Sequence, residues 1–451
     1  MKAINTSIIR RLNFKTKAIW IVFVLFTAAI TGIAISEKEI IYFAIALSPF
    51  IVYLCIHKPF IFPFGLYVFL LPFENFLSVT GGSQGATLTK FLGALTILVL
   101  CLKGSFENKL KRPDPASIWL VLFVIYGFLT VWWAIEPHLV MGSIFTAVSL
   151  LLLYLVVASY KLQKDEFETI KWCILFGGFV AAAFTIYNYQ LGLLDFGQEI
   201  TQRATLDIGG RKANANTVGF SLIFPIAIGI HMVLEKRRKI IRVMLGAALF
   251  VTVFALIITG ARGSMLGVAG VVIINFLSLK NRITFGTVLI VIAIIIIPFI
   301  PDLFFERWAK ATSSGGAGRM DIWYAGLKAL EKHWLFGAGL NNFPAAYDEF
   351  ALYPSRFMGY YRAAHNTYLG NFVELGIVGF SFMILAIWKH YKAIQSRIKP
   401  HNFDEIMLTA VLFGVLIAAF FGDYASRKVF WLVLMMICMY KNVSVKNSVY
   451  L

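Results

Sequence analysis

One histidine of this chain stands where acid–base chemistry is possible. His365 and Asn366 occur in Ala-Ala-His-Asn-Thr-Tyr (363–368), where a long polar segment meets an apolar run. A neutral imidazole can accept a proton from an attacking hydroxyl group or orient that group. A lone histidine at such a boundary is also commonly a structural hydrogen-bonding group. Spacing alone leaves both interpretations open.

Among the basic residues, Arg262 has the most informative sequence surroundings. It lies in Thr-Gly-Ala-Arg-Gly-Ser (259–264), a tight turn between two apolar runs, which places its guanidinium group at a membrane edge. Guanidinium presents a planar fork of donors that suits phosphate, and it stays charged at any relevant pH. The alternative is an arginine that snorkels to lipid headgroups. We predict that Arg262 binds a lipid-linked diphosphate.

A second basic motif, Arg-Lys-Ala-Asn-Ala-Asn (211–216), leads into another apolar run. Asn214 and Asn216 lie at the expected start of a helix, where free N–H groups favour anions. Helix capping is the simpler role for these asparagines, and the two roles can coexist. The motif therefore predicts anion binding by Arg211, Asn214 and Asn216.

The composition excludes an ordinary soluble protein. Of the 451 residues, 59% are hydrophobic and 14% are charged, whereas soluble domains are about a quarter charged. Apolar runs recur from residue 18 to residue 440. Such runs should be helices, because hydrocarbon offers no hydrogen-bond partner to an open backbone. We predict an all-α polytopic membrane protein, with residues 1–451 forming a single transmembrane domain.

The apolar runs predict twelve to fourteen transmembrane helices. The segment 59–78 contains Pro59, Pro63 and Pro72, and the segment 427–441 is short, so either could be re-entrant. The candidate spans are 18–36, 40–57, 59–78, 86–102, 116–135, 139–159, 169–192, 216–234, 240–259, 261–279, 284–301, 365–388, 405–421 and 427–441.

Charge distribution predicts the orientation of these spans. With the N-terminus in the cytoplasm, nearly every second connection is basic, including 103–112, 161–164, 236–239, 280–282 and 389–399. Both termini are then expected in the cytoplasm. The net charge of +18 follows from this bias and from contact with anionic membrane lipids, so no nucleic-acid partner is expected.

The other predicted face carries cations that this bias disfavours, and two long segments, 193–215 and 302–364. Cations kept there suggest an anionic ligand. They are Arg203, Arg211, Lys212, Arg262, Arg307, Lys310, Arg319, Arg356, Arg362, Arg427 and Lys428.

The large outer loop 302–364 is expected to be partly helical. An apolar stripe recurs at helical spacing, with charged residues on the opposite face, so the helix could lie on the bilayer or cap a cavity. The stripe comprises Met320, Trp323, Leu327, Leu330 and Trp334, and the charged face Asp321, Lys328, Glu331 and Lys332.

Several motifs that would indicate other chemistry do not occur. The sequence contains no P-loop, no dinucleotide-binding glycine motif, no HExxH and no DxD. The match to GxSxG at 81–85 falls in a short connection and not in a nucleophile elbow. We expect no metal and no cofactor. A site facing outward has no access to cytoplasmic nucleotide sugars, so its donor must carry its own leaving group, as a polyprenyl diphosphate does.

Four ordered segments resemble the O-antigen ligase and O-antigen polymerase superfamily of bacterial glycan-assembly proteins. They are RKANANTVGF (211–220), TGARGS (259–264), GRMDIWYAGLKALEKHWLFGAGLNNF (318–343) and AHNTYLGNFVELGIVGF (364–380), and PFENFL (72–77) resembles an early element of some members. Ala261 stands where many members have serine.

The resemblance implies a C-type membrane glycosyltransferase fold and a metal-independent, inverting transfer. The donor would be an undecaprenyl-diphosphate-linked glycan in the bacterial cytoplasmic membrane, with the active site facing outside. Arg211, Arg262 and Arg319 would neutralise the diphosphate, and His365 would activate the acceptor hydroxyl. Guanidinium groups placed in advance stabilise the charge that develops on the leaving diphosphate.

The predicted site has two parts. The catalytic residues are His365, Arg262 and Arg211, and the substrate-binding residues are Arg319, Asn214, Asn216, Asn366 and Arg203.

Several functions remain open at this point. An O-antigen ligase uses a lipid-anchored acceptor, a polymerase uses another lipid-linked glycan, and a protein O-oligosaccharyltransferase uses a serine or threonine segment. A transporter or flippase of a lipid-linked sugar should carry ionisable groups along its midplane. Glu374 and His231 are the deep exceptions in otherwise apolar spans. The clustering of cations at one face favours an enzyme.

Overall fold

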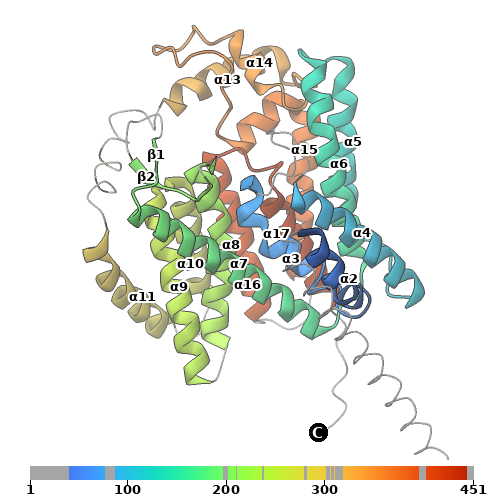
Figure 1. The fold of residues 1–451 in the computed structure, drawn as a ribbon. Helices are drawn as coiled ribbons and strands as arrows, with labels where there is room; N and C mark the ends of the chain where they lie inside the picture. The colour runs from blue at the N-terminus through green and yellow to red at the C-terminus, as the bar shows by residue number, and fades with distance from the viewer. Residues whose placement is uncertain are drawn as a thin grey trace, which may run out of the picture.

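The computed structural model describes residues 40–76, 87–196, 202–209, 211–235, 238–278, 282–300, 318–395 and 403–443, with residues 305 and 309. Helices dominate this part of the chain and pack side by side as a bundle (Figure 1). The α-helices are α2 (Ile40–His57), α3 (Phe64–Phe69), α4 (Leu88–Phe106), α5 (Ser117–Leu129), α6 (Pro137–Ser159), α7 (Lys164–Gln190), α8 (Ala215–Glu235), α9 (Lys239–Thr259), α10 (Arg262–Ser278), α11 (Arg282–Ile296), α13 (Arg319–His333), α14 (Phe343–Asp348), α15 (Thr367–Gln395), α16 (Phe403–Ala418) and α17 (Lys428–Asn442).

The predicted class, an all-α polytopic membrane protein, is confirmed. Among the described residues, seven helices are long and apolar enough to cross a membrane, and Ser117–Trp132 and Arg262–Ser278 are shorter apolar helices. The expected first span, 18–36, lies outside the described residues. Several other expected spans form helices of fewer than 18 residues, such as α17.

The segment 59–78, expected either as a span or as a re-entrant segment, does not form a continuous helix in its described residues. The structure breaks it into the six-residue α3 and the 3₁₀-helix η1 (Leu71–Phe76). Proline supplies no backbone N–H and clashes with the preceding turn, so Pro63 and Pro72 interrupt the helical ladder. Phe64 and Tyr67 of α3 are buried against protein. This segment therefore contributes to the core.

The expected long segment 193–215 forms two small hairpins, which the sequence analysis did not predict. Strand β1 (Leu194–Phe196) pairs with β2 (Gln202–Ala204), and β3 (Asp207–Ile208) pairs with β4 (Arg211–Lys212), both antiparallel. The side chain of Asn188, near the end of α7, donates to the carbonyl oxygen of Asp207 at 2.9 Å. That bond ties the second hairpin to the bundle.

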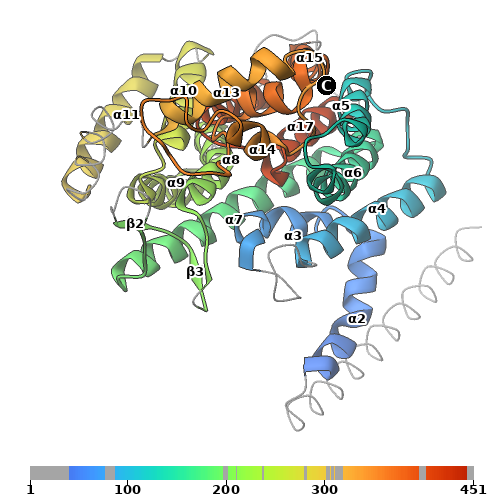
Figure 2. The ribbon, with the colours of Figure 1, turned by 90° about the horizontal axis from the view of Figure 1, so that it is seen from above.

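Helix α13 forms where the outer-loop pattern predicted a helix, but the predicted apolar stripe is not its buried face. Met320, Leu327 and Trp334 are more than half exposed. The buried residues are Ile322, Ala325, Gly326 and Ala329. Small side chains allow α13 to approach α14 and α15 closely, and this packing outweighs the burial of the larger residues. Figure 2 shows α13 lying across one end of the bundle.

Helix α15 is broken in its middle by an inserted loop. Gly376 has φ 60° and ψ −172°, which are not helical values. The loop 334–342 fills this break, because Trp334 accepts from the amide of Ile377 at 2.8 Å and Gly339 donates to the carbonyl of Glu374 at 2.8 Å. The loop thus forms hydrogen bonds with backbone groups that have no partner within the helix because of the break.

The other deep ionisable residue of the predicted spans, His231, joins a cluster of charges at one end of the bundle. We call Lys171, Asp404, His231, Glu235 and Glu168 the far-end charge cluster. Lys171 is fully buried and its Nζ lies 2.8 Å from Oδ1 of Asp404. His231 Nε2 lies 3.3 Å from the same oxygen. These residues join the start of α7, the end of α8 and the start of α16.

The opposite end of the bundle is where α8, α10, α15 and α17 begin, and we call it the site end. The hairpins and α13 lie at this end (Figure 1).

Candidate functional site

His365 and Asp423 form the centre of the site end. The amide of His365 donates to Asp423 Oδ2 at 3.0 Å, and His365 Nδ1 lies 3.9 Å from the same oxygen. Both side chains are 43% exposed, so the pair is open to a ligand. His365 has φ 48°, in the left-handed region that histidine adopts more readily than most residues. The contact with Asp423 stabilises this backbone.

The residues after His365 fix the pair to two elements. The Oδ1 atom of Asn366 accepts from the amides of Tyr368 and Leu369 at 3.0 and 3.1 Å, which caps α15. Thr367 Oγ1 donates to the carbonyl of Gly422 at 2.6 Å and accepts from the amide of Tyr424 at 2.9 Å. Asn366 therefore has a capping role, and Thr367 holds the segment around Asp423 against the start of α15.

Tyr424 connects this pair to α8. Its ring stacks on Phe220 with 3.7 Å between ring centroids and 10° between planes. Its hydroxyl lies 3.5 Å from the carbonyl oxygen of Asn216. The first turns of α8 and the start of α15 thus reach the same place, although about 150 residues separate them in the sequence.

The charges of three arginines act on the pair: those of Arg319 and Arg362 on His365, and that of Arg427 on Asp423. The enclosing protein lowers the pKa of His365, and the guanidinium groups of Arg319 and Arg362 lower it further against the opposite effect of Asp423. Burial raises the pKa of Tyr424 to about 12, and the charges of Arg319 and Arg427 oppose this rise. The imidazole is therefore neutral at neutral pH, in a site that favours an anion.

Arg262 begins α10 directly after a left-handed turn at Gly260, which has φ 59°. Close packing fixes the turn. A Cβ on Gly219 of α8 would lie 2.5 Å from the Cβ of Ala261, and a Cβ on Gly263 would lie 2.5 Å from Phe421. Glycine at both positions lets α8 and the end of α16 approach the turn. Arg262 is therefore held at the site end, half-buried.

The remaining predicted residues lie on the hairpin side of α8. Arg203 is 8% exposed, and its Nη1 donates to Asn216 Oδ1 at 3.4 Å. Asn214 Oδ1 accepts from the amide of Asn216 at 2.9 Å, which is a capping contact. Arg211 is exposed on β4, whose partner β3 lies at the edge of the molecule (Figure 2).

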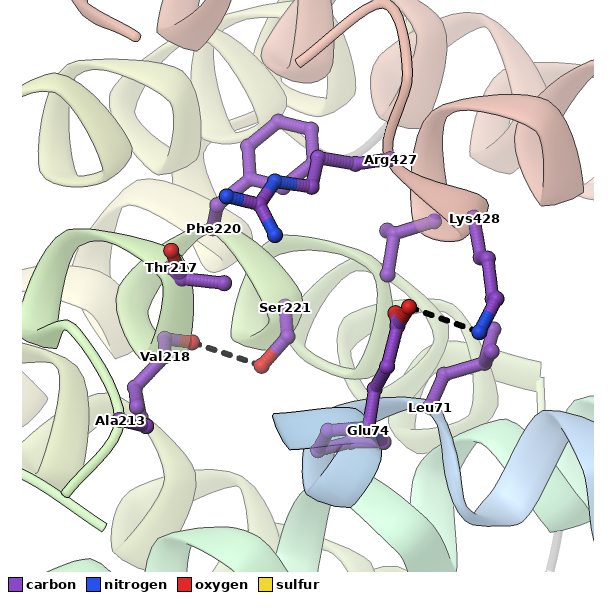
Figure 3. Close-up of a pocket in the computed structure, with 11 residues that line it drawn as sticks. Leu71, Glu74, Ala213, Thr217, Val218, Phe220, Ser221, Arg427 and Lys428 are labelled. Carbon is purple, nitrogen blue, oxygen red and sulfur yellow. Dashed lines mark hydrogen bonds and ion pairs between the residues drawn. The ribbon is translucent and has the colours of Figure 1, made fainter. Parts of the chain in front are cut away.

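A pocket opens beside this site, between η1 and the first turns of α8 and α17 (Figure 3). The side chain of Arg427 extends over Thr217 and Phe220, and the carboxylate of Glu74 faces Lys428. Glu74 Oε1 lies 2.7 Å from Lys428 Nζ. The pocket is therefore part of the site end.

The sequence alone does not indicate that Asp423, Tyr424 or Glu74 belongs to the site. Arg362 and Arg427 were recognised only as outer cations. The available signal was weak: Asp423 is the first carboxylate after an apolar run, at the same predicted face as His365. Its pairing with His365 depends on the packing of α15 against the end of α16.

Comparison with known proteins relates one segment of the chain to a family. Residues 247–384 match the family model described as O-antigen ligase. This match supports the resemblance of the chain to the O-antigen ligase and polymerase superfamily. The matched segment contains Arg262, Arg319 and His365. An uncharacterised protein of Haemophilus influenzae is 26% identical over 208 residues, which cover 40% of this chain and 50% of that protein.

The matched family and the fold together indicate the kind of protein. The similarity supports a role in surface glycan assembly, and the seven long apolar helices of the described residues indicate a protein that crosses the membrane several times. The chain spans about half the length of the curated relative that it matches.

Proposed function

We propose that this protein transfers a glycan from undecaprenyl diphosphate to an acceptor hydroxyl on the outer side of the cytoplasmic membrane. The observation that carries the proposal is the half-exposed His365–Asp423 pair with Arg319, Arg362 and Arg427 around it. A base and an anion-binding group are the two parts that such a transfer needs.

In the proposed reaction, the acceptor oxygen attacks the anomeric carbon and its proton passes to Nε2 of His365. The bond from the anomeric carbon to the diphosphate oxygen breaks, and undecaprenyl diphosphate leaves with the electron pair. A single displacement inverts the anomeric centre. Asp423 orients the imidazole through its Nδ1 side and stabilises the imidazolium that forms. A contact of 3.9 Å shortens when substrate closes the site, as is common for catalytic hydrogen bonds.

The arginines neutralise the charge that the departing diphosphate gains, so no metal ion is required for this role. Arg262 and Arg319 bind the diphosphate, and Arg203, Asn216 and Arg211 supply further donors to it. Asn214 and Asn366 shape the two helix starts that face the anion. Guanidinium groups held by helix packing need little reorganisation, which is the condition for stabilising a transition state more than a ground state.

A transporter fits these observations less well. The two deep ionisable residues have structural partners. Glu374 Oε1 accepts from the amide of Phe343 at 3.4 Å, and His231 contacts Asp404. The first contact closes the break in α15 and the second joins helices at the far end. Neither residue therefore needs a transported ligand to satisfy it.

Mass analysis of products tests the proposal. Purified protein in liposomes is mixed with an undecaprenyl-diphosphate oligosaccharide and with lipid-anchored, glycan and serine-peptide acceptors. We expect a new glycosidic bond and released undecaprenyl diphosphate, and the acceptor that is used distinguishes ligase, polymerase and protein glycosyltransferase. Movement of the intact lipid-linked glycan across the bilayer without a new bond would refute the enzyme.

Cysteine labelling tests the orientation. Leu352 and Ile240 are 71% and 67% exposed, the first in the loop before α15 at the site end and the second at the start of α9 at the far end. In intact cells, an impermeant maleimide should label Leu352→Cys and spare Ile240→Cys. The reverse pattern would place the site in the cytoplasm.

A further inference from the structure

The pocket between η1, α8 and α17 shares Arg427 with the proposed catalytic site, and its other lining residues have no part in the proposed catalytic steps. Its polar lining comprises the carboxylate of Glu74, the guanidinium of Arg427 and the hydroxyl groups of Thr217 and Ser221, while Leu71 and Val429 contribute apolar surface (Figure 3).

Ion pairing between lining residues partly neutralises the charges of the pocket. Lys428 is 6% exposed, and its Nζ contacts Glu74 at 2.7 Å and the hydroxyl of Thr89 at 2.8 Å. The ammonium group is thus held by protein atoms. The carboxylate keeps further acceptor capacity, because each of its oxygens accepts more than one hydrogen bond. Glu74 therefore presents an acceptor, next to a donor fork from Arg427.

This lining suits a hydroxylated ring better than a phosphate group. A carboxylate repels a phosphate but accepts hydrogen bonds from hydroxyl groups, while guanidinium donates to ring and hydroxyl oxygens. Ser221 Oγ donates to the carbonyl of Val218 at 2.7 Å, so this oxygen keeps its lone pairs as acceptors. Apolar walls such as Leu71 and Val429 can pack on the C–H face of a sugar ring.

The pocket adjoins the proposed catalytic pair. Phe220, which lines it, stacks on Tyr424, the residue after Asp423. The charge of Arg427 acts on both Asp423 and Tyr424. A ligand in the pocket therefore lies next to the place where the diphosphate and the acceptor are proposed to meet.

We propose that this pocket binds the sugar ring attached to the diphosphate of the lipid-linked donor, with Glu74 and Thr217 as the groups that select it. The proposal rests on the proposed function and adds where the first donor sugar is bound.

Direct binding tests this assignment. Full-length protein in nanodiscs is titrated with undecaprenyl diphosphate, with the same lipid bearing one N-acetylglucosamine, and with the same lipid bearing one galactose. We expect wild-type protein to bind at least one sugar-bearing lipid about tenfold more tightly than the bare lipid, as hydrogen bonds to a charged group allow. Glu74→Gln and Thr217→Val should reduce that advantage without weakening the binding of bare lipid.

Glu349→Gln is the matched control, because Glu349 pairs with Lys332 at 3.0 Å on an exposed surface. It should bind all three lipids as wild type does. Melting temperatures confirm folding, and Thr217→Val, which keeps the side-chain shape, carries the test if Glu74→Gln does not fold.

Two outcomes overturn the assignment. One is a wild-type protein that binds no sugar-bearing lipid better than bare lipid. The other is a pair of pocket variants that lose affinity for all three lipids equally. A wild-type protein that binds none of the three lipids would instead refute the proposed function. The two failures are therefore distinguishable.

Discussion

Charged residues gather at both ends of this helical bundle, but the two groups differ in how their charges are satisfied. In the far-end charge cluster, Lys171 is fully buried and contacts Glu168 and Asp404. At the site end, His365 and Asp423 are each 43% exposed. Arginines there act on a pair that bears one formal negative charge.

The difference separates structural charges from functional ones. A buried ion pair with both partners present joins helices α7, α8 and α16, and loss of one partner leaves an uncompensated charge in a place that water cannot reach. An exposed pair beside an excess of cations contributes little to stability and is available to an anionic ligand. Substitutions in the two clusters should therefore affect different quantities.

Removal of the base should have the largest effect on transfer. His365→Ala is expected to lower the turnover rate about 100- to 10,000-fold, because general base catalysis contributes about that much. Folding should remain intact, as judged by the melting temperature. His138→Ala is the matched control, since His138 is an exposed histidine at the start of α6. Equal activity of the two variants would contradict the role of His365.

Loss of one arginine should have the second-largest effect on transfer. Arg262→Ala and Arg319→Ala are each expected to lower turnover about 100- to 1,000-fold, as does loss of one group that stabilises a developing negative charge. Lysine at either position should restore part of the rate, since it keeps the charge but not the fork. Turnover is measured with the lipid-linked oligosaccharide, and Lys332→Ala on the exposed surface of α13 is the control. If both alanine variants turned over at the wild-type rate, the assignment of diphosphate binding to Arg262 and Arg319 would be refuted.

Loss of the orienting carboxylate should have a smaller effect and a characteristic pH dependence. The reaction needs neutral imidazole, and the pKa of His365 is already lowered by the enclosing protein, so activity should persist below the pH at which free histidine becomes charged. Asp423 raises that pKa. Asp423→Asn should therefore move the acid limb of kcat/KM to lower pH and reduce the rate about tenfold. An unmoved acid limb would mean that His365 does not titrate in the reaction.

A substitution in the far-end charge cluster should have the smallest effect on transfer and a large effect on stability. Lys171→Met leaves Asp404 without its ammonium partner and should lower the free energy of unfolding by about 3–5 kcal/mol. Lys332→Met, in an exposed pair, should change it by about 0–1 kcal/mol. Unfolding in detergent and turnover per folded molecule measure the two effects. A transfer defect in correctly folded Lys171→Met would show that the far end takes part in function.

The sequence predicted well what depends on local composition. Long apolar runs require helices in hydrocarbon, and this requirement identified the class of fold. Arg262 and His365 stood out because each lies where a polar segment meets an apolar run, at the predicted outer face. Their assignment to one site remains a proposal, but both lie at the site end.

Local composition did not specify which face of a helix packs against its neighbours. The residues 320–334 repeat apolar side chains at helical spacing, yet α13 buries Ile322, Ala325 and Ala329, because the helix meets other helices and not lipid alone. The prolines of 59–78 made a continuous helix doubtful from the sequence. Only the packing of α3 against the core shows why the chain tolerates the break in this segment.

By itself, then, the sequence determined that this protein is a helical membrane protein with cations and a histidine at the ends of its spans, because hydrocarbon imposes that pattern residue by residue. Only the tertiary structure brought Asp423 to His365 and Glu74 to Lys428, residues 58 and 354 positions apart along the chain. Such contacts depend on which helices pack together, and hydrophobic spacing within one helix does not specify its neighbour.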